Sequence, residues 1–500
     1  MARTRDDPGR MLRDYGTPKR SAFRIDEKDM IADEQTRVLT RFHEATARLE
    51  SLIDGTPSPA DASRDAVQER ATYRMGRLRR FLALLGNPHR GYPIVHVGGT
   101  SGKGSTSTLI ASILVSAGYR TGLHTSPYLQ TPAEKLQING ALVAPEVYVD
   151  LCDTVFAAHE RWLAAGEEPI TYGEAWFALT ALFFRESHVD VAVLEVGAGG
   201  RFDLTNIIEP IVSVITSVGI DHTATLGSSI AEIAWHKAGI VKPGVPAVTS
   251  VSNPEALAIV AAEAASRQAP LTIVDPALAA TDVRTDFQGT SWTDRRTGFR
   301  FHTALRGAFQ ARNGAAATAV IEALRGLGHH VSDEAVERGL QSARIPGRVE
   351  MIEDSRMVML DGAHNVEKMG ALAGDIPRLL PVGSGGQRIA VLGVLEAKQA
   401  VSMVRSLVPV MDVLVATAPR VTAKEARDAS AIAAIAAEAD FHGPVWIEPE
   451  PRTAIDRALD LAGAHAASAV VVTGSLYLIG NVRERWYAED DIVLARSPWP

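Results

Sequence analysis

A glycine-rich turn joins a short β-branched run to a helix-like run near residue 100. Ile94–Val97 predicts a strand, residues 98–104 read Gly-Gly-Thr-Ser-Gly-Lys-Gly, and Thr106–Ala117 predicts a helix. In such a turn backbone N–H groups converge on phosphate oxygens, and the start of the helix carries the positive end of its dipole. We therefore expect a nucleoside triphosphate to bind at Gly102, Lys103, Gly104 and Ser105.

This turn departs from the common phosphate-loop pattern G-x-x-x-x-G-K-[ST]. Val97 stands at the first glycine position, and Gly104 stands where a hydroxyl residue usually follows the lysine. The pattern alone therefore does not assign a nucleotide hydrolase. A tight turn without a ligand is the alternative, although a lysine inside a glycine cluster at a helix start favours binding.

Short β-rich runs alternate with helix-like runs from Pro93 onward, and this alternation predicts mostly parallel sheets flanked by helices. A stretch of low periodicity at 275–303 predicts a small excursion or hairpin before the helix Asn313–Leu327. The breaker pair after Ile345 marks a boundary, because a new alternation begins there. We predict a leader over 1–33, a large P-loop ATP-binding domain over 34–344, and a smaller Rossmann-like α/β domain over 345–500.

Composition narrows the class of protein. The chain is 46% hydrophobic, carries a net charge of −8 and has one cysteine, Cys152, which excludes an internal disulfide framework and a thiolate zinc cluster. We interpret Cys152 as a small buried apolar residue, with a catalytic thiol as the alternative. Because the N-terminus lacks a secretory signal and no run of about 18 apolar residues occurs, we expect a cytoplasmic protein that binds neither membrane nor nucleic acid.

Three polar side chains of the large domain follow or lie within predicted elements, and one of them is a candidate metal ligand. Glu195 ends an apolar run, so its carboxylate is expected at the carboxyl edge of a parallel sheet, where ligands bind. An oxygen ligand near a phosphate suits Mg²⁺, with an ion-paired or capping glutamate as the alternative. His222 follows another strand-like run, and Lys237 falls on a probable helix. Taken alone, His222 is interpreted as a hydrogen-bonded structural histidine. Lys237 is interpreted as a solvated helix lysine or as a cation that interacts with the helix dipole at its C-terminus.

In the second domain, Asp361-Gly362-Ala363-His364-Asn365 follows a predicted strand. An acid and an imidazole on such a turn suit a cleft between domains. Asx-turn chemistry would explain Asp361 and Asn365 but would leave His364 unexplained.

Seven ordered segments together resemble the folylpolyglutamate synthase and dihydrofolate synthase family, which is related to the Mur peptide ligases. They span about residues 74–477, and as an ordered set they are specific. The segments are Gly99–Ser105, Thr125–Leu129, Leu194–Asp203, Asp221-His222, Lys237–Ile240, Pro346–Arg348 and Asp361–Asn365.

The resemblance implies roles for individual residues. Ser126, Glu195 and His222 would hold Mg²⁺, and Lys237, once carbamylated, would help to bind a second Mg²⁺. ATP would contact Asn313, Arg348 and Asp361, while His364 would face the amino-acid substrate. The pterin part of a folate would bind near a further set of residues, namely Thr171, Tyr172, Gly173, Glu174, Phe202, Asp203, Leu204 and Met75.

The resemblance also implies the reaction, a step of folate biosynthesis and one-carbon metabolism. A monomer would use ATP to phosphorylate the carboxylate of dihydropteroate or a reduced folate, and L-glutamate would attack the resulting acyl phosphate to form an amide. Gly173 and Leu204 depart from a dual-function bacterial pattern that has an aromatic residue and an alanine there. The alternatives are therefore a folylpolyglutamate synthase alone, a Mur-type ligase, or a noncatalytic nucleotide switch.

Overall fold

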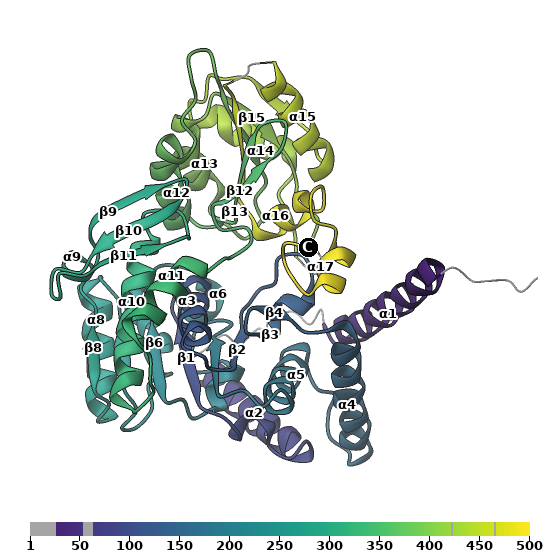
Figure 1. Ribbon diagram of the computed structural model, residues 1–500, viewed down its shortest axis with the longest axis vertical. Helices are drawn as coiled ribbons and strands as arrows, with labels where there is room; N and C mark the ends of the chain where they lie inside the picture. Colours follow the sequence, from purple (N-terminus) through teal and green to yellow (C-terminus); the bar gives the residue numbers. More distant parts are fainter. Residues whose placement is uncertain (1–26, 54–63, 422–423, 465–466) are drawn as a thin grey trace, which may run out of the picture.

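The computed structural model describes residues 27–53, 64–421, 424–464 and 467–500 (Figure 1). Most of the expected leader, 1–33, and the linker expected at Asp54–Pro57 lie outside these ranges. The described chain forms two α/β domains. The larger is drawn mainly in purple to teal, and the smaller in green to yellow. The expected fold class, a large domain with a parallel-rich sheet and a separate C-terminal sheet domain, is confirmed.

An eight-stranded sheet forms the large domain, with the order β4-β3-β2-β5-β1-β6-β7-β8. The six strands β2, β5, β1, β6, β7 and β8 are parallel to one another. At the edge of the sheet, β3 pairs antiparallel with β2, and β4 pairs antiparallel with β3. The strands are β1 Ile94–Gly98, β2 Thr121–His124, β3 Gln137–Ile138, β4 Ala141–Leu142, β5 Val191–Glu195, β6 Val212–Ile215, β7 Ala247–Thr249 and β8 Leu271–Ile273.

Helices cover both faces of this sheet, so its central strands are buried throughout, as parallel strands usually are. Alternate residues of β1 point to opposite cores: Ile94 packs with α1, α2, α4 and α5, whereas Val95 packs with α3, α10 and α11. The helices are α1 Glu27–Glu50, α2 Arg64–Leu84, α3 Lys103–Ser116, α4 Pro145–Ala164, α5 Tyr172–Glu186, α6 Thr223–Leu226, α7 Ile230–Ala238, α8 Pro254–Ser266, α9 Pro276–Ala279, α10 Gln310–Gly326 and α11 Asp333–Ser342. Cys152 of α4 lies in the first core, buried, and burial raises its pKa to about 12, as suits an apolar packing role.

Residues 275–303, predicted as a small excursion or hairpin, form three strands where a hairpin would have two. They form an antiparallel three-stranded sheet of β9 Thr281–Asp286, β10 Gly289–Thr293 and β11 Arg300–Thr303. Trp292 of β10 is fully buried in the core beneath α10, and this contact anchors the excursion to the large domain.

The C-terminal domain is a six-stranded sheet with the order β12-β13-β17-β14-β15-β16, parallel except for β12. Helices α12 to α14 cover one face, and α15 and α16 cover the other. The strands are β12 Glu350–Glu353, β13 Met357–Asp361, β14 Arg388–Leu392, β15 Val413–Ala416, β16 Val445–Ile447 and β17 Ala469–Thr473. The helices are α12 Val366–Leu379, α13 Ala400–Leu407, α14 Ala429–Glu438, α15 Pro451–Gly463, α16 Leu476–Arg483 and α17 Glu489–Ala495.

The end of the chain returns to the large domain. Ile492 and Val493 of α17 are fully buried in the same core as α1 and α4, and Leu142 of β4 exchanges backbone and side-chain hydrogen bonds with Arg496. The range 345–500 thus spans a sheet domain and a final segment that packs elsewhere. Figure 1 shows this C-terminus where the two domains meet.

A buried ion pair connects this C-terminal segment to residues 345–348, the link between the two domains, which we call the hinge. Arg483 is fully buried, its Nε donates to Glu350 at 3.0 Å, and Glu350 in turn accepts from the Gly347 N–H and the Trp499 indole. Arg483→Leu would leave the Glu350 carboxylate buried without its cation. We expect it to lower the free energy of unfolding by about 3 to 5 kcal/mol in denaturant titrations.

A matched change on the surface tests the role of burial. Arg452 pairs with Glu484 at 4.0 Å and is 66% exposed, so Arg452→Leu should cost at most about 1 kcal/mol. Equal losses for the two variants would contradict the importance of the buried pair.

Candidate active site

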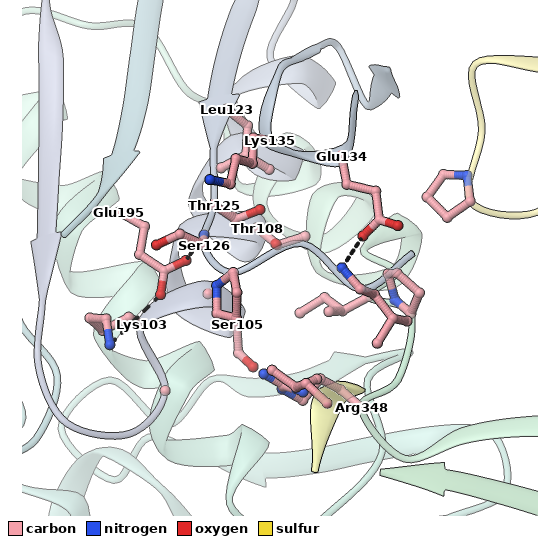
Figure 2. Close-up of a pocket in the computed structure, with 18 of the residues that line it drawn as sticks. Lys103, Ser105, Thr108, Leu123, Thr125, Ser126, Glu134, Lys135, Glu195 and Arg348 are labelled. Carbon is pink, nitrogen blue, oxygen red and sulfur yellow. Dashed lines mark hydrogen bonds and ion pairs between the residues drawn. The ribbon is translucent and has the colours of Figure 1, made fainter. Parts of the chain in front are cut away.

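A cavity of about 750 Å³ lies between the two domains. The large domain contributes the start of α3, the carboxyl ends of β2 and β5, and the turn before α6, while the C-terminal domain contributes the hinge, the start of α12 and the loop after β14. Pro498 and Trp499 from the end of the chain also line it. Figure 2 shows side chains from these separate segments facing one space.

The glycine-rich turn follows β1 and lies at the edge of this cavity. Gly99 and Gly102 have φ angles of 145° and 83°, and a Cβ at Gly99 would approach Thr216 Oγ1 to 2.0 Å, so both positions require glycine. The loop is fastened to the segment after β6, because the Thr100 N–H donates to Ser217 O at 2.9 Å. Lys103, Gly104 and Ser105 begin α3 and line the cavity with Gly102, as the expected phosphate site requires.

Asn313 does not reach the cavity lining. It stands on α10, and a Cβ at Gly102 would meet its Oδ1 at 2.3 Å, so the amide packs directly beneath the turn. Its Nδ2 donates to Gln310 Oε1 at 2.8 Å. In this position Asn313 supports the shape of the loop.

Glu195 ends β5 and faces the turn. Its Oε2 accepts from the Ser126 N–H at 3.0 Å, and its Oε1 lies 3.8 Å from Lys103 Nζ (Figure 2). Burial raises the pKa of this carboxyl, and the nearby Lys103 ammonium opposes that shift. A Cβ at Gly104 would lie 3.4 Å from Glu195 Oε2, an ordinary van der Waals contact, so the carboxylate packs directly against the loop at this position.

Oxygen donors at this point fit magnesium better than a transition metal. Across the described ranges, no group of three or more His, Cys, Asp or Glu side chains could hold a metal by itself. The Ser126 hydroxyl and the Glu195 carboxylate are hard ligands beside the phosphate loop. They fit Mg²⁺, which usually takes one or two protein ligands and completes its shell with phosphate oxygens and water.

The turn before α6 holds Asp221 and His222, and Asp221 contacts the C-terminal domain. Asp221 Oδ1 lies 2.9 Å from Lys398 Nζ, and its Oδ2 accepts from Asn365 Nδ2 at 3.4 Å. The Lys398 ammonium therefore holds the pKa of the Asp221 carboxyl below its ordinary value, against the effect of burial. His222, with φ of 53°, lines the same cavity. The ion pair of Asp221 with Lys398 links the two domains.

Lys237 is buried, so the interpretation as a solvated helix lysine is wrong. It lies near the end of α7, is 3% exposed, and its Nζ donates to Gly99 O at 2.9 Å. Burial, reinforced by the nearby Lys103 charge, lowers its pKa to about 7. At neutral pH a large fraction of this amine is therefore uncharged.

The second-domain motif lies at the start of α12, but its acid and its imidazole face different surroundings. Asp361 is buried under the hinge and accepts from the Val349 and Ala363 N–H groups at 3.0 and 2.9 Å, so Asx-type hydrogen bonding accounts for it. Arg348 and His364 line the cavity. His364 Nδ1 lies 2.9 Å from Gly362 O, which can only accept, so Nδ1 carries the proton and Nε2 accepts from Lys368 Nζ at 3.0 Å.

None of the expected pterin residues is part of the cavity lining. Glu174 is fully buried, pairs with Arg77 Nε at 3.0 Å, and completes the capping box of α5 with Thr171. Asp203 accepts from the Ala198 and Thr205 N–H groups. Phe202 packs edge-on against Trp235, Met75 packs on the core of α1, α4 and α5, and Tyr172 packs edge-on against Trp176.

Gly173 and Leu204, the two departures from the dual-function pattern, touch each other. A Cβ at Gly173 would lie 3.0 Å from Leu204 Cδ1. The larger side chain at one position thus occupies space left by the smaller one at the other. The two changes compensate in volume, so they argue less against a pterin pocket than either would alone.

Four lysines that line the cavity, Lys135, Lys368, Lys398 and Lys424, were not among the site residues predicted from the sequence. Lys368 stands one helical turn after His364, a spacing that brings side chains together and could have revealed it. Lys398 and Lys135 lie on a loop and a short 3₁₀ turn, and neither carries a local sequence signal.

Comparison with known proteins settles the family. Residues 97–321 match the Mur ligase middle domain and residues 347–476 match the Mur ligase glutamate ligase domain. The dihydrofolate synthase/folylpolyglutamate synthase of Bacillus subtilis is 35% identical over 423 residues, covering 82% of this chain and 94% of that protein. The chain belongs to the dihydrofolate synthase/folylpolyglutamate synthase family. The expected class of enzyme, an ATP-dependent ligase, is confirmed.

Solved structures of this family share the fold. Mycobacterium tuberculosis folylpolyglutamate synthase complexed with ADP has a TM-score of 0.78 at 29% identity and covers 90% of this chain and 98% of its own. Escherichia coli FolC in complex with DHPP and ADP has a TM-score of 0.71 at 27% identity, with 88% and 97% covered. Across the described helices, none is long and apolar enough to cross a membrane.

Proposed function

We propose that this enzyme ligates L-glutamate to dihydropteroate, making dihydrofolate, and to reduced folates, adding γ-linked glutamates, with ATP as co-substrate. One observation carries the proposal: the phosphate loop with Glu195 and Ser126 faces Arg348 and His364 of the other domain across a single cavity. The bifunctional names and bound ligands of the relatives support the same reaction. A noncatalytic nucleotide switch would leave the residues of the second domain without a use.

The first step joins the acceptor to phosphate. The loop N–H groups and Lys103 hold the triphosphate, and an oxygen of the acceptor carboxylate attacks the γ-phosphorus as the bond to ADP breaks. The acceptor leaves this step as an acyl phosphate. Magnesium held by Ser126, Glu195 and His222 would supply further neutralisation of phosphate charge.

The second step forms the amide. The α-amine of glutamate attacks the acyl carbonyl, inorganic phosphate leaves, and the nitrogen loses a proton. His364 and Lys368 face the amino-acid substrate in this proposal, and burial lowers the pKa of Lys368 to about 7, so this pair holds a basic nitrogen at neutral pH. No thiol takes part, in agreement with the buried Cys152.

Lys237 completes the proposed site only after modification. Its amine is not a magnesium ligand, but reaction of its neutral form with carbon dioxide would give a carbamate with two oxygen donors. The buried position next to Gly99 would then bring these oxygens near the phosphates and support a second Mg²⁺. Arg348 would contact the nucleotide, with Asp361 and Asn313 fixing the hinge and the loop.

Acceptor-dependent ADP release tests the function. Purified protein with ATP, Mg²⁺ and L-glutamate should release ADP only when dihydropteroate or a reduced folate is added, and the glutamylated product should appear in equal amount. Comparing dihydropteroate with tetrahydrofolate separates dual activity from folylpolyglutamate synthesis alone. ADP release that ignores both glutamate and acceptor would rule the proposal out. A cytoplasmic monomer that binds no nucleic acid stays a prediction.

A further inference from the structure

Lys135 is a buried cation without an acidic partner. Its side chain belongs to the 3₁₀ turn Pro132–Lys135, and the residue is 9% exposed. Within the part of the chain that the structure describes, no carboxylate forms an ion pair with its ammonium. Three aromatic rings surround it instead: Nζ lies 4.2 Å from the Trp176 ring centre, 5.3 Å from Tyr172 and 5.6 Å from Tyr128.

The neighbouring acid is not available as that partner. Glu134 is buried and turned toward the preceding loop, where its carboxylate accepts from the N–H groups of Leu129 and Gln130 at 2.9 Å each, and of Thr131 at 3.2 Å. These hydrogen bonds fix the turn that carries Lys135. The charge is therefore held at a set place, and its own loop does not neutralise it.

The ammonium lies on the cavity beside the proposed metal ligands. Lys135 lines the same space as Ser126 and Glu195, and Figure 2 draws its side chain together with theirs around that space. Burial lowers the pKa of Lys135 to about 8, so most of the side chain stays charged at neutral pH. Contacts with aromatic faces offset only part of the cost of burying such a charge.

A carboxylate would fit this position. The acceptor must bring one to the phosphate loop, where it approaches the negative charge of the triphosphate. A cation in the lining that also holds Ser126 and Glu195 would neutralise that carboxylate and orient its oxygen. The three aromatic rings contact Lys135 from outside that lining and hold its side chain in place.

We propose that Lys135 binds the acceptor carboxylate that receives the phosphoryl group, which makes it a positioning group for the first step. This inference rests on the proposed function and names the acceptor subsite within it. Among the acceptors, dihydropteroate is the sharper probe, because it carries a single carboxylate.

Lys135→Met keeps the apolar stem and removes the charge. We expect the KM for dihydropteroate to rise about 10- to 100-fold while the KM for ATP stays within about twofold of the wild type, because a buried charge pair is lost on one substrate only. Lys135→Arg should recover most of the loss. Lys242→Met is the matched control, since Lys242 is half-buried with a pKa of about 8 but donates to Asn206 O, and it should leave both constants unchanged.

A ligand without the carboxylate isolates the contact. The amide of dihydropteroate, titrated calorimetrically without glutamate, should bind wild type and Lys135→Met equally, whereas dihydropteroate itself should bind the variant more weakly. Unchanged dihydropteroate binding in Lys135→Met overturns the inference, and so does an equal loss of acid, amide and ATP binding, which would mark a packing role. Failure of the proposed function would differ, because the wild type itself would then show no acceptor-dependent ADP release.

Discussion

Lys103→Ala should lower kcat by about 10³-fold or more while the protein stays folded. Lys103 starts α3, lines the cavity, and is the cation nearest to Glu195 in the phosphate loop, at 3.8 Å. In phosphoryl transfer the protein acts mainly by positioning and charge neutralisation, so loss of a fixed cation at the β- and γ-phosphates removes several kcal/mol of transition-state stabilisation. Product formation from dihydropteroate measures the loss.

The fold control for this variant uses circular dichroism and a denaturant titration. Glu195 is only 5% exposed and would lose its cation, but the pair is long at 3.8 Å and the carboxylate keeps the hydrogen bond from the Ser126 N–H. The free energy of unfolding should therefore fall by about 1 to 3 kcal/mol, which leaves the protein folded. Lys242→Ala should retain turnover, because that amine lies outside the cavity lining. Turnover of Lys103→Ala within tenfold of the wild type would contradict the role given to the loop.

The sequence predicted those parts of the site that follow buried strands. Glu195 is the last residue of β5 and the glycine-rich turn follows β1, and the carboxyl ends of these neighbouring parallel strands meet at one edge of the sheet. Local sequence order therefore decides their position in space. The second-domain motif at the end of β13 could be placed by the same rule, and the Asx-turn alternative for Asp361 agrees with its hydrogen bonds from the Val349 and Ala363 N–H groups.

Features that depend on distant packing could not be predicted in this way. Lys237 looked like a surface lysine because one helical turn does not show which face is buried, whereas the structure places its Nζ on Gly99 O. The return of the chain end to the large domain brings Val493 into its core and joins Arg496 to Leu142 of β4, which lies 354 positions earlier in the sequence. The burial of Lys135 against the Tyr172 and Trp176 rings of α5 could not be predicted, because those residues lie far from it in the sequence.

The compensating pair Gly173 and Leu204 shows the same limit at the pterin residues. Each change alone suggests an altered pocket, because sequence gives no distance between positions 31 residues apart. In the structure a Cβ at 173 would lie 3.0 Å from the leucine methyl carbon, closer than an ordinary van der Waals contact. Only the contact reveals that one change balances the other.

Lys237→Met should lower turnover about 100-fold or more and abolish any dependence on bicarbonate. The amine is buried with a pKa of about 7, so its neutral form is available to react with carbon dioxide at physiological pH, and only the carbamate offers oxygen ligands. In the wild type, turnover at fixed pH should rise when bicarbonate is added to protein depleted of carbon dioxide. Acetate should restore part of the activity of Lys237→Ala, because it supplies a carboxylate to the space left by the side chain.

The pH dependence of stability checks the state of the unmodified amine. The folded pKa of about 7 lies below the ordinary value of 10.5, so between these values the unfolded chain binds more protons than the native one. Without bicarbonate, the wild-type free energy of unfolding should therefore rise with pH across this window relative to Lys237→Met. If the free energies of unfolding of the wild type and Lys237→Met change with pH in the same way, the pKa of Lys237 is not lowered in the folded protein. Turnover that ignores bicarbonate in the wild type and survives in Lys237→Met would exclude the carbamate.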